Sequence, residues 1–356
     1  MRSKSSHKNC RVSVSLCALM AIGGYAAQAR GQARTAVETD RGPRQVEARV
    51  KTDQDIFDFH SGLWMNLHHF LYQQALAQKA GREGRAVGGA GEVVSVEALN
   101  DEEKRVWATA LEGYQKNWVN RDLLFDNDLT KIKYRLAELE NQTTLKQSGL
   151  PDELIATLEM AAPVYRTHWW KEHDRINRSW IEGAASLARK HGRIICERLA
   201  KAYREPWAKG PIRAEVAIYA SWSGAYTTER PTLITISSAN AGYQGLAALE
   251  MVFHEASHAM IDTVQKGIEN ECAAQGKQVP GILWHVALFY TTGEIVKRAL
   301  AENGQRDYEP YAYKQGLYQR GPNMSQYRQL MEKHWQPYLD GKSDFAEAIK
   351  QMVAGL

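Results

Sequence analysis

The sequence predicts a mainly helical protein with one small antiparallel sheet, an α+β fold. Apolar residues recur at every third or fourth position through most of the chain, as on the buried side of a helix. Residues 206–239 differ, because they contain two runs rich in β-branched and aromatic residues that are separated by Ser223-Gly224. The 356 residues are 44% hydrophobic and 24% charged, which is a globular composition and excludes a wholly disordered chain.

The first 29 residues have the features of a secretory signal peptide. A basic stretch up to Arg11 precedes an apolar run at 12–25, and the small residues Ala27 and Ala29 suit a cleavage site after Ala29. Cleavage after Ala33 and an uncleaved anchor are the alternatives. The segment holds four of the 45 basic residues and none of the 41 acidic ones, so 41 of each remain. We therefore expect an exported protein, periplasmic or secreted, without a nucleic-acid-binding surface or a stable membrane span after cleavage.

The elements of the first half of the chain are predicted to be helices. Residues 30–54 are polar without an apolar period and predict a flexible leader, and 55–205 predict a helical lobe. Three acidic residues after Asn100 suit the start of a helix, and a glycine-rich break at 81–91 precedes it. The helices of this lobe are expected at 55–78, from 100 onward, and at 121–142, 151–161, 163–190 and 190–204.

A second lobe is predicted over 206–356, and no linker separates it from the first. Cys196 and Cys272 remain after removal of the signal peptide, and they form either a disulfide or two separately buried thiols. A loop rich in Tyr, Gly and Pro is expected at 304–323. The strands of this lobe are expected at 212–222 and 232–239, and its helices at 243–266, 281–302, 325–334 and 343–353.

The residues that indicate chemistry are His254-Glu255-Ala256-Ser257-His258, an HExxH motif in an apolar helical stretch. On a helix, positions i and i+4 lie on the same side, so both imidazoles can reach one metal ion. Glu255 is rotated by about 100° from His254, which places its carboxylate beside the open position of the metal. The motif predicts one Zn²⁺ ion bound by His254 and His258, with Glu255 as the general base for a zinc-activated water. A helix whose histidines are satisfied by hydrogen bonds is the alternative.

Around this motif, residues 230–300 resemble the zincin metallopeptidases. A strand-like segment precedes the motif, and His254-Glu255-x-x-His258-Ala259-x-x-Asp262 is similar to the H-E-x-x-H-A-x-x-D run of thermolysin-like enzymes. The resemblance implies a zincin-like catalytic core and, as in the gluzincin branch, a third ligand from a glutamate on a later helix. It also implies that Asp262 accepts a hydrogen bond from a ligand imidazole; an exposed aspartate at a helix end is the alternative.

The third ligand is predicted to be Glu294. The position about twenty residues after His258, where thermolysin-like enzymes place it, is Gln278. Glu294 lies in a strongly apolar helix, where a lone carboxylate usually has a cation or a metal as its partner. Glu269, Glu271 and His285 are the alternatives. His285 precedes Glu294 by nine residues, about half a turn around the helix, so both can hardly face one metal ion.

Further candidates are groups that would stabilise a transition-state oxyanion. His285 at the rim of the site, Tyr311 and Tyr318 have suitable donors. Packing in the loop is the commoner explanation for a tyrosine, and a backbone hydrogen bond is the alternative for His285.

The sequence therefore predicts an exported zinc metallohydrolase, and most specifically a peptidase that acts on a peptide or protein substrate. A zincin-like hydrolase of a non-peptide amide is one alternative. The other is a non-catalytic helical binding protein of the cell envelope.

Overall fold

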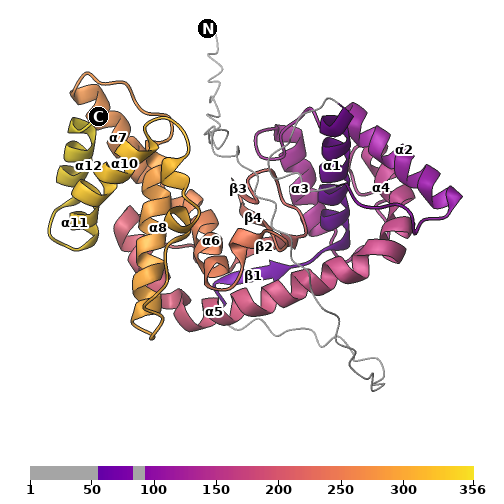
Figure 1. Ribbon diagram of the computed structural model, residues 1–356, viewed down its shortest axis with the longest axis horizontal. Helices are drawn as coiled ribbons and strands as arrows, with labels where there is room; N and C mark the ends of the chain where they lie inside the picture. The colour runs from indigo at the N-terminus through magenta and orange to yellow at the C-terminus, as the bar shows by residue number, and fades with distance from the viewer. Residues whose placement is uncertain (1–54, 83–92) are drawn as a thin grey trace, which may run out of the picture.

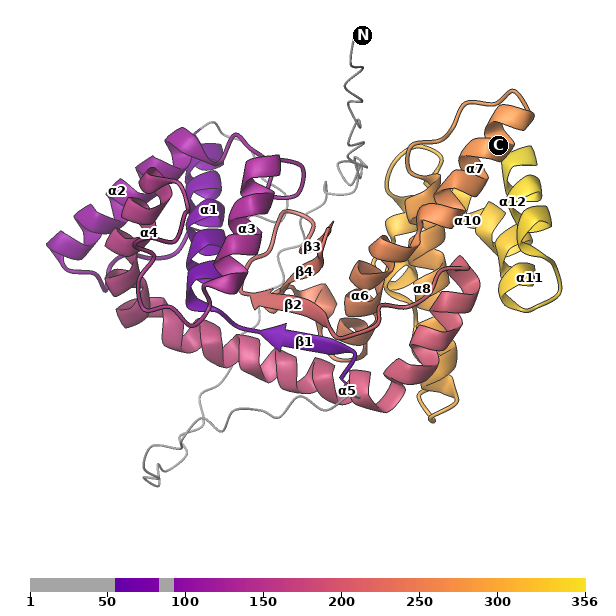
Figure 2. The ribbon, with the colours of Figure 1, turned by 180° about the vertical axis from the view of Figure 1, so that it is seen from behind.

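The computed structural model describes residues 55–82 and 93–356, and the predicted signal peptide (1–29) and leader (30–54) lie outside them. The described chain is mainly helical with one small sheet, as the sequence predicts. Figure 1 and the reverse view in Figure 2 show helices on both sides of the sheet and one long helix, α5, along the base of both groups. Within the described ranges, no helix has the length and apolar character needed to cross a membrane.

The first lobe consists of helices that share one apolar core. Its helices are α1 (Leu63–Arg82), α2 (Asp101–Asn117), α3 (Asn127–Glu138) and α4 (Asp152–Tyr165). The predicted start of α2 is confirmed, because the side chain of Asn100 accepts a hydrogen bond from the backbone N–H of Glu103 and the Glu103 carboxylate accepts one in return. Tyr219, Tyr226 and Leu233 extend from the sheet region into this core.

The sheet is mixed, whereas the sequence predicts an antiparallel one. Its strands, in spatial order, are β1 (Phe57–His60), β2 (Ile212–Ala217), β4 (Thr232–Ser237) and β3 (Ala225–Glu229). The β1–β2 and β2–β4 pairs are parallel, and only β3 and β4 form an antiparallel pair. The helix expected from residue 55 begins at Leu63 instead, because β1 pairs with β2, a partner about 150 residues away that local periodicity does not reveal.

The second lobe surrounds a second core and carries the HExxH motif. Its helices are α6 (Leu246–Ser257), α7 (Asp262–Ala274), α8 (Leu283–Ala301), α9 (Tyr311–Lys314), α10 (Met324–Leu330), α11 (Gln336–Leu339) and α12 (Phe345–Ala354). The single helix expected at 243–266 is divided into α6 and α7 by a 3₁₀ turn at His258–Met260. The tyrosine-rich loop at 304–323 contains α9.

Helix α5 (Lys171–Tyr203) links the two lobes as one continuous element, where two helices are expected. Its second half packs into the second core through residues such as Leu199 and Tyr203. The expected lobe boundary at 205/206 therefore does not separate the two cores. Cys196 and Cys272 are both buried free thiols, so the alternative of separate thiols is the one the structure shows.

Candidate metal centre

The HExxH motif spans the carboxyl end of α6 and the first residue of the 3₁₀ turn that follows it. This helix packs against β3, β4, α5 and α8, and every residue from Ala248 to Ser257 is buried. A helix enclosed in this way has an apolar sequence on all sides, which explains the apolar run before the motif. The ring centroids of His254 and His258 are 5.2 Å apart, so the predicted convergence of these two imidazoles is confirmed.

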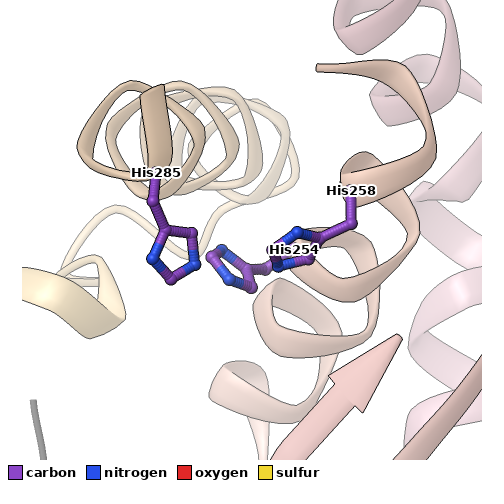
Figure 3. A group of neighbouring side chains, drawn as sticks. All are labelled: His254, His258 and His285. Carbon is purple, nitrogen blue, oxygen red and sulfur yellow. The ribbon is translucent and has the colours of Figure 1, made fainter. Parts of the chain in front are cut away.

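A third imidazole completes the group. His285 lies in the first turn of α8, and its ring centroid is 5.3 Å from that of His254 and 5.2 Å from that of His258. Each of the three rings offers a nitrogen within 4.8 Å of the other two. Figure 3 shows the three side chains pointing toward one another from the two helices.

The expected third ligand, Glu294, is not part of this group. Its carboxylate lies 3.6 Å from Lys297 Nζ, one turn further along α8. The cation partner that a carboxylate in an apolar helix requires is therefore a lysine. Glu294 and His285 do not face the same point, as their nine-residue separation predicts, and the third-ligand assignment passes to His285. His285 is thus a candidate ligand and not a donor at the rim of the site.

The chemistry of the three imidazoles fits a bound metal ion. All three side chains are buried, and within residues 55–82 and 93–356 no hydrogen-bond partner exists for His254 Nδ1 or for either ring nitrogen of His285. Burial lowers the pKa of each imidazole, and the neighbouring imidazoles lower those of His254 and His285 further. Neutral imidazole is the form that binds a metal. Buried nitrogens without partners cost free energy, and coordination would remove that cost.

Glu255 lies in the same pocket as the three imidazoles. Its Oε2 atom is 2.7 Å from Oγ1 of Thr227 on β3. Burial raises the pKa of Glu255 to about 7, although the Thr227 hydroxyl and the positive charge of Lys133 act in the opposite direction. The structure therefore brings together four of the predicted residues: His254, Glu255, His258 and His285.

The pocket lies where the two lobes meet. Leu124, from the segment between α2 and α3, and Ser223, from the turn before β3, are among its lining residues. Its space is about 50 Å³. The remaining lining residues come from β3, α6, α8 and the 3₁₀ turns at Ala241–Tyr243 and His258–Met260: Ala225, Tyr226, Thr227, Tyr243, Met251, His254, Glu255, His258, His285 and Phe289.

The predicted tyrosines do not line this pocket. Tyr311 stacks on Phe289 with ring centroids 6.3 Å apart, and Phe289 in turn packs on His254 at 3.8 Å. Tyr318 is 1% exposed and packs against Tyr313 in the second core. Both rings make packing contacts, as the alternative of packing expects, and neither tyrosine is among the residues that line the pocket.

The remaining acidic candidates lie on α7 and away from the imidazoles. Asp262 is exposed, and its carboxylate lies 3.4 Å from Lys266 Nζ. This placement agrees with the alternative of an exposed aspartate at a helix end. Glu269 is exposed and accepts a hydrogen bond from Gln265, and Glu271 accepts one from Gln275. The expected turn before Pro280 is helical as far as Ala274, and the helix turns these carboxylates toward its own neighbours.

Two buried charged residues near the site are not among the predicted ones. Lys133 on α3 is 1% exposed, and it lies among Leu129, Ile132 and Leu136 at helical spacing. A lysine on the apolar side of a helix is a signal that the sequence does contain. Glu250 has the same kind of signal, since it lies one turn before His254 in an apolar run.

Glu250 connects α6 to the tyrosine-rich loop. Its carboxylate accepts hydrogen bonds from the Tyr308 hydroxyl at 2.7 Å and from the backbone N–H of Tyr311 at 2.9 Å. Burial raises the pKa of Glu250 to about 7, and the nearby charge of Glu294 acts in the same direction, against the two hydrogen bonds. This carboxylate fixes α6 to the loop that follows α8.

The arrangement as a whole combines three neutral imidazoles with one carboxyl group in a single small pocket. Comparisons with known proteins find no matching family model, no matching curated protein and no matching solved structure.

Proposed function

We propose that this chain is a zinc-dependent hydrolase and, most specifically, a peptidase. The observation that carries the proposal is the convergence of His254, His258 and His285 in the pocket that also contains Glu255. Three nitrogen ligands with one position left open are typical of catalytic zinc sites, whereas structural sites use four protein ligands. Export through the N-terminal segment is part of the proposal and stays a prediction.

Each residue has a role that its chemistry allows. The three imidazoles would hold Zn²⁺, which when bound supplies Lewis-acid chemistry that polarises a carbonyl group and lowers the pKa of water. Glu255 accepts the proton from the attacking water and delivers it to the leaving amine. The buried surroundings of the carboxyl group keep bulk water away from that transfer.

The position of the sheet favours a peptide as the substrate. β3 is an edge strand of the sheet, and its residues Ala225, Tyr226 and Thr227 line the pocket. An extended peptide can pair with an edge strand through main-chain hydrogen bonds. Hydrolysis of a small non-peptide amide is the second candidate, because a pocket of about 50 Å³ is small beside the several hundred Å³ of common ligand sites.

The test is hydrolysis of a peptide library and of a panel of small amides by the zinc-loaded mature protein. The Glu255→Gln variant serves as the inactive counterpart and Glu269→Gln, an exposed glutamate on α7, as the matched control. We expect peptide cleavage by the wild type and by Glu269→Gln, and loss of several orders of magnitude in Glu255→Gln. Cleavage of amides alone would favour the second candidate. A zinc-loaded wild type without either activity would overturn the proposal.

A further inference from the structure

Thr227 makes two contacts with the proposed general base. Its hydroxyl oxygen is 2.7 Å from Glu255 Oε2 and 2.9 Å from the backbone carbonyl oxygen of the same residue. Thr227 and Glu255 are 9% and 4% exposed, so water does not compete freely for these contacts. The hydroxyl therefore holds the carboxylate relative to the end of α6.

The alternation of side chains along β3 explains why Thr227 faces Glu255. Successive residues of a strand point to opposite sides of the sheet. Ala225 packs into the second core and Tyr226 into the first, so Thr227 returns to the side of α6. In the observed register of β3 and β4, Thr227 pairs with Ile234. A shift of this register by one residue would turn the Thr227 side chain to the other side of the sheet and away from Glu255.

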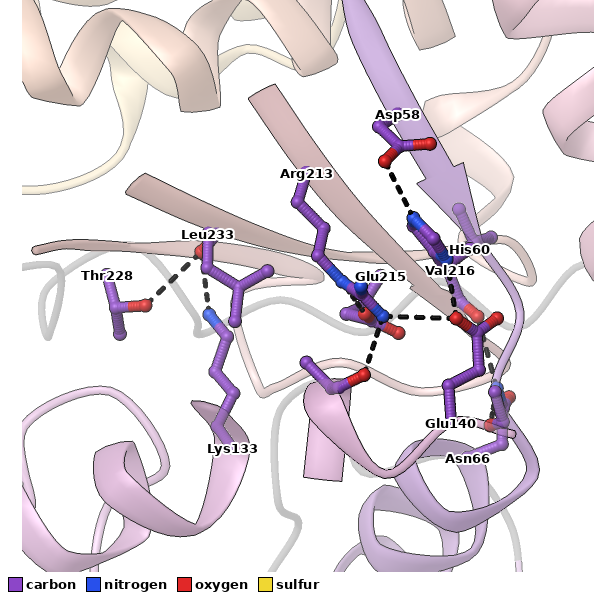
Figure 4. Close-up of polar contacts among 12 residues, drawn as sticks. Asp58, His60, Asn66, Lys133, Glu140, Arg213, Glu215, Val216, Thr228 and Leu233 are labelled. Carbon is purple, nitrogen blue, oxygen red and sulfur yellow. Dashed lines mark hydrogen bonds and ion pairs between the residues drawn. The ribbon is translucent and has the colours of Figure 1, made fainter. Parts of the chain in front are cut away.

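The first lobe fixes the strand from the other side. Lys133 Nζ donates a hydrogen bond to the carbonyl oxygen of Leu233 on β4 at 2.8 Å, as Figure 4 shows. The same ammonium group lies 4.1 Å from the ring centroid of Tyr226. The Tyr226 hydroxyl is 2.9 Å from Nε2 of His69 on α1. β3 is thus held by two helices of the first lobe immediately beside Thr227.

Resting on the proposed function, we propose that Thr227 is a positioning residue that aims the Glu255 carboxylate into the pocket of the three imidazoles. The hydrogen bonds of the Thr227 hydroxyl go to Glu255, and Thr227 acts through that residue. Loss of its hydroxyl leaves a buried carboxylate oxygen without a partner, and the carboxylate is then expected to turn toward another donor.

The test compares Thr227→Val, which keeps the shape of the side chain, with Thr227→Ser, which keeps the hydroxyl. We expect kcat to fall by about 10- to 100-fold in Thr227→Val, as for other groups that orient a catalytic residue, with KM and zinc content unchanged. Thr227→Ser should recover most of kcat. Equal kcat in Thr227→Val and the wild type would overturn the proposal, as would a Thr227→Ser variant as impaired as Thr227→Val.

A crystal structure of Thr227→Val provides a measurement that does not depend on activity. We expect the Glu255 carboxylate to leave its position while the three imidazoles keep theirs. An unmoved carboxylate would contradict the positioning role even if the protein proved to have no hydrolase activity. The proposed function fails on a different result, which is a wild type that binds zinc without hydrolysing peptides or amides.

Discussion

The imidazole of His285 and the carboxylate of Glu294 lie on different sides of helix α8, nine residues apart. The side that carries His285 faces α6 and the two histidines of the motif. On the other side, Glu294 forms an ion pair with Lys297. The negative charge of Glu294 also raises the pKa of Glu250. One helix therefore supplies the candidate third ligand from its first turn and a structural ion pair from its second half.

Gly293 allows α8 to pass close to Glu250 and to the tyrosine-rich loop. A Cβ atom at this position would lie 2.8 Å from Pro310 Cβ and 3.2 Å from Glu250 Oε1. We expect Gly293→Ala to lower the free energy of unfolding by about 1–3 kcal/mol, as for other overpacked positions.

Gly183 is the matched control, since it is exposed on α5 and a Cβ atom there meets no described residue within 4 Å. Gly183→Ala should raise the free energy of unfolding by about 0.5–1 kcal/mol through helix propensity alone. Urea denaturation of both variants measures the difference. A Gly293→Ala variant as stable as Gly183→Ala would show that α8 and the loop do not pack as described.

Glu250 should make stability depend on pH. Its pKa is about 7 in the folded protein, against an ordinary value of 4.5, so the folded state binds the proton more tightly. This contribution to stability is fully present below pH 4.5 and is lost as the pH rises through 7. Between pH 5 and pH 8, the stability of the wild type relative to Glu250→Gln should fall by on the order of 2 kcal/mol. Denaturation curves at several pH values test this, and a constant difference would refute it.

His60 is a second source of pH dependence, at the junction between the sheet and the first lobe. Its Nδ1 atom lies 2.6 Å from Glu140 Oε2 and its Nε2 atom 3.1 Å from Asp58 Oδ2, as Figure 4 shows. Burial lowers the pKa of His60, but the hydrogen bond to Glu140 and the surrounding carboxylates outweigh it, and the net pKa is raised above 6.5.

A raised histidine pKa stabilises the fold below pH 6.5, and this stabilisation disappears as the pH rises through the folded-state pKa. Replacement of His60 by Gln should therefore cost about 1–3 kcal/mol at pH 6 and less at pH 8.5. Thermal or urea unfolding at the two pH values measures the change. A larger cost at the higher pH would contradict the assignment of charge to His60.

Sequence patterns predict the structural features that depend on residues close together in the chain. The helical period of apolar residues predicts most of the helices, and the i, i+4 spacing predicts that the imidazoles of His254 and His258 converge. They miss β1, because Phe57–His60 become a strand only when β2 arrives from the other half of the chain. The parallel pairing of β1, β2 and β4 is likewise a property of the tertiary fold.

The third ligand shows the same limit. The nine-residue spacing in the sequence shows that Glu294 and His285 cannot both bind the same metal ion. Which of the two is the candidate ligand depends on the side of α8 that faces α6. The sequence favours Glu294 as the third ligand, because a lone glutamate in an apolar helix needs a cation or a metal as its partner. In the structure that partner is Lys297. Thr227 belongs to no recognisable sequence motif, and it contacts Glu255 only because of the register of β3 on β4.

The measurement that tests the central claim most directly is zinc content per chain after dialysis, for the wild type, His285→Ala and Glu294→Ala. The wild type should retain about one zinc ion, because three imidazoles and an open position suit this metal. Glu294→Ala should retain as much, while His285→Ala should lose most of it under the same conditions. Full retention by His285→Ala together with loss from Glu294→Ala would contradict the account.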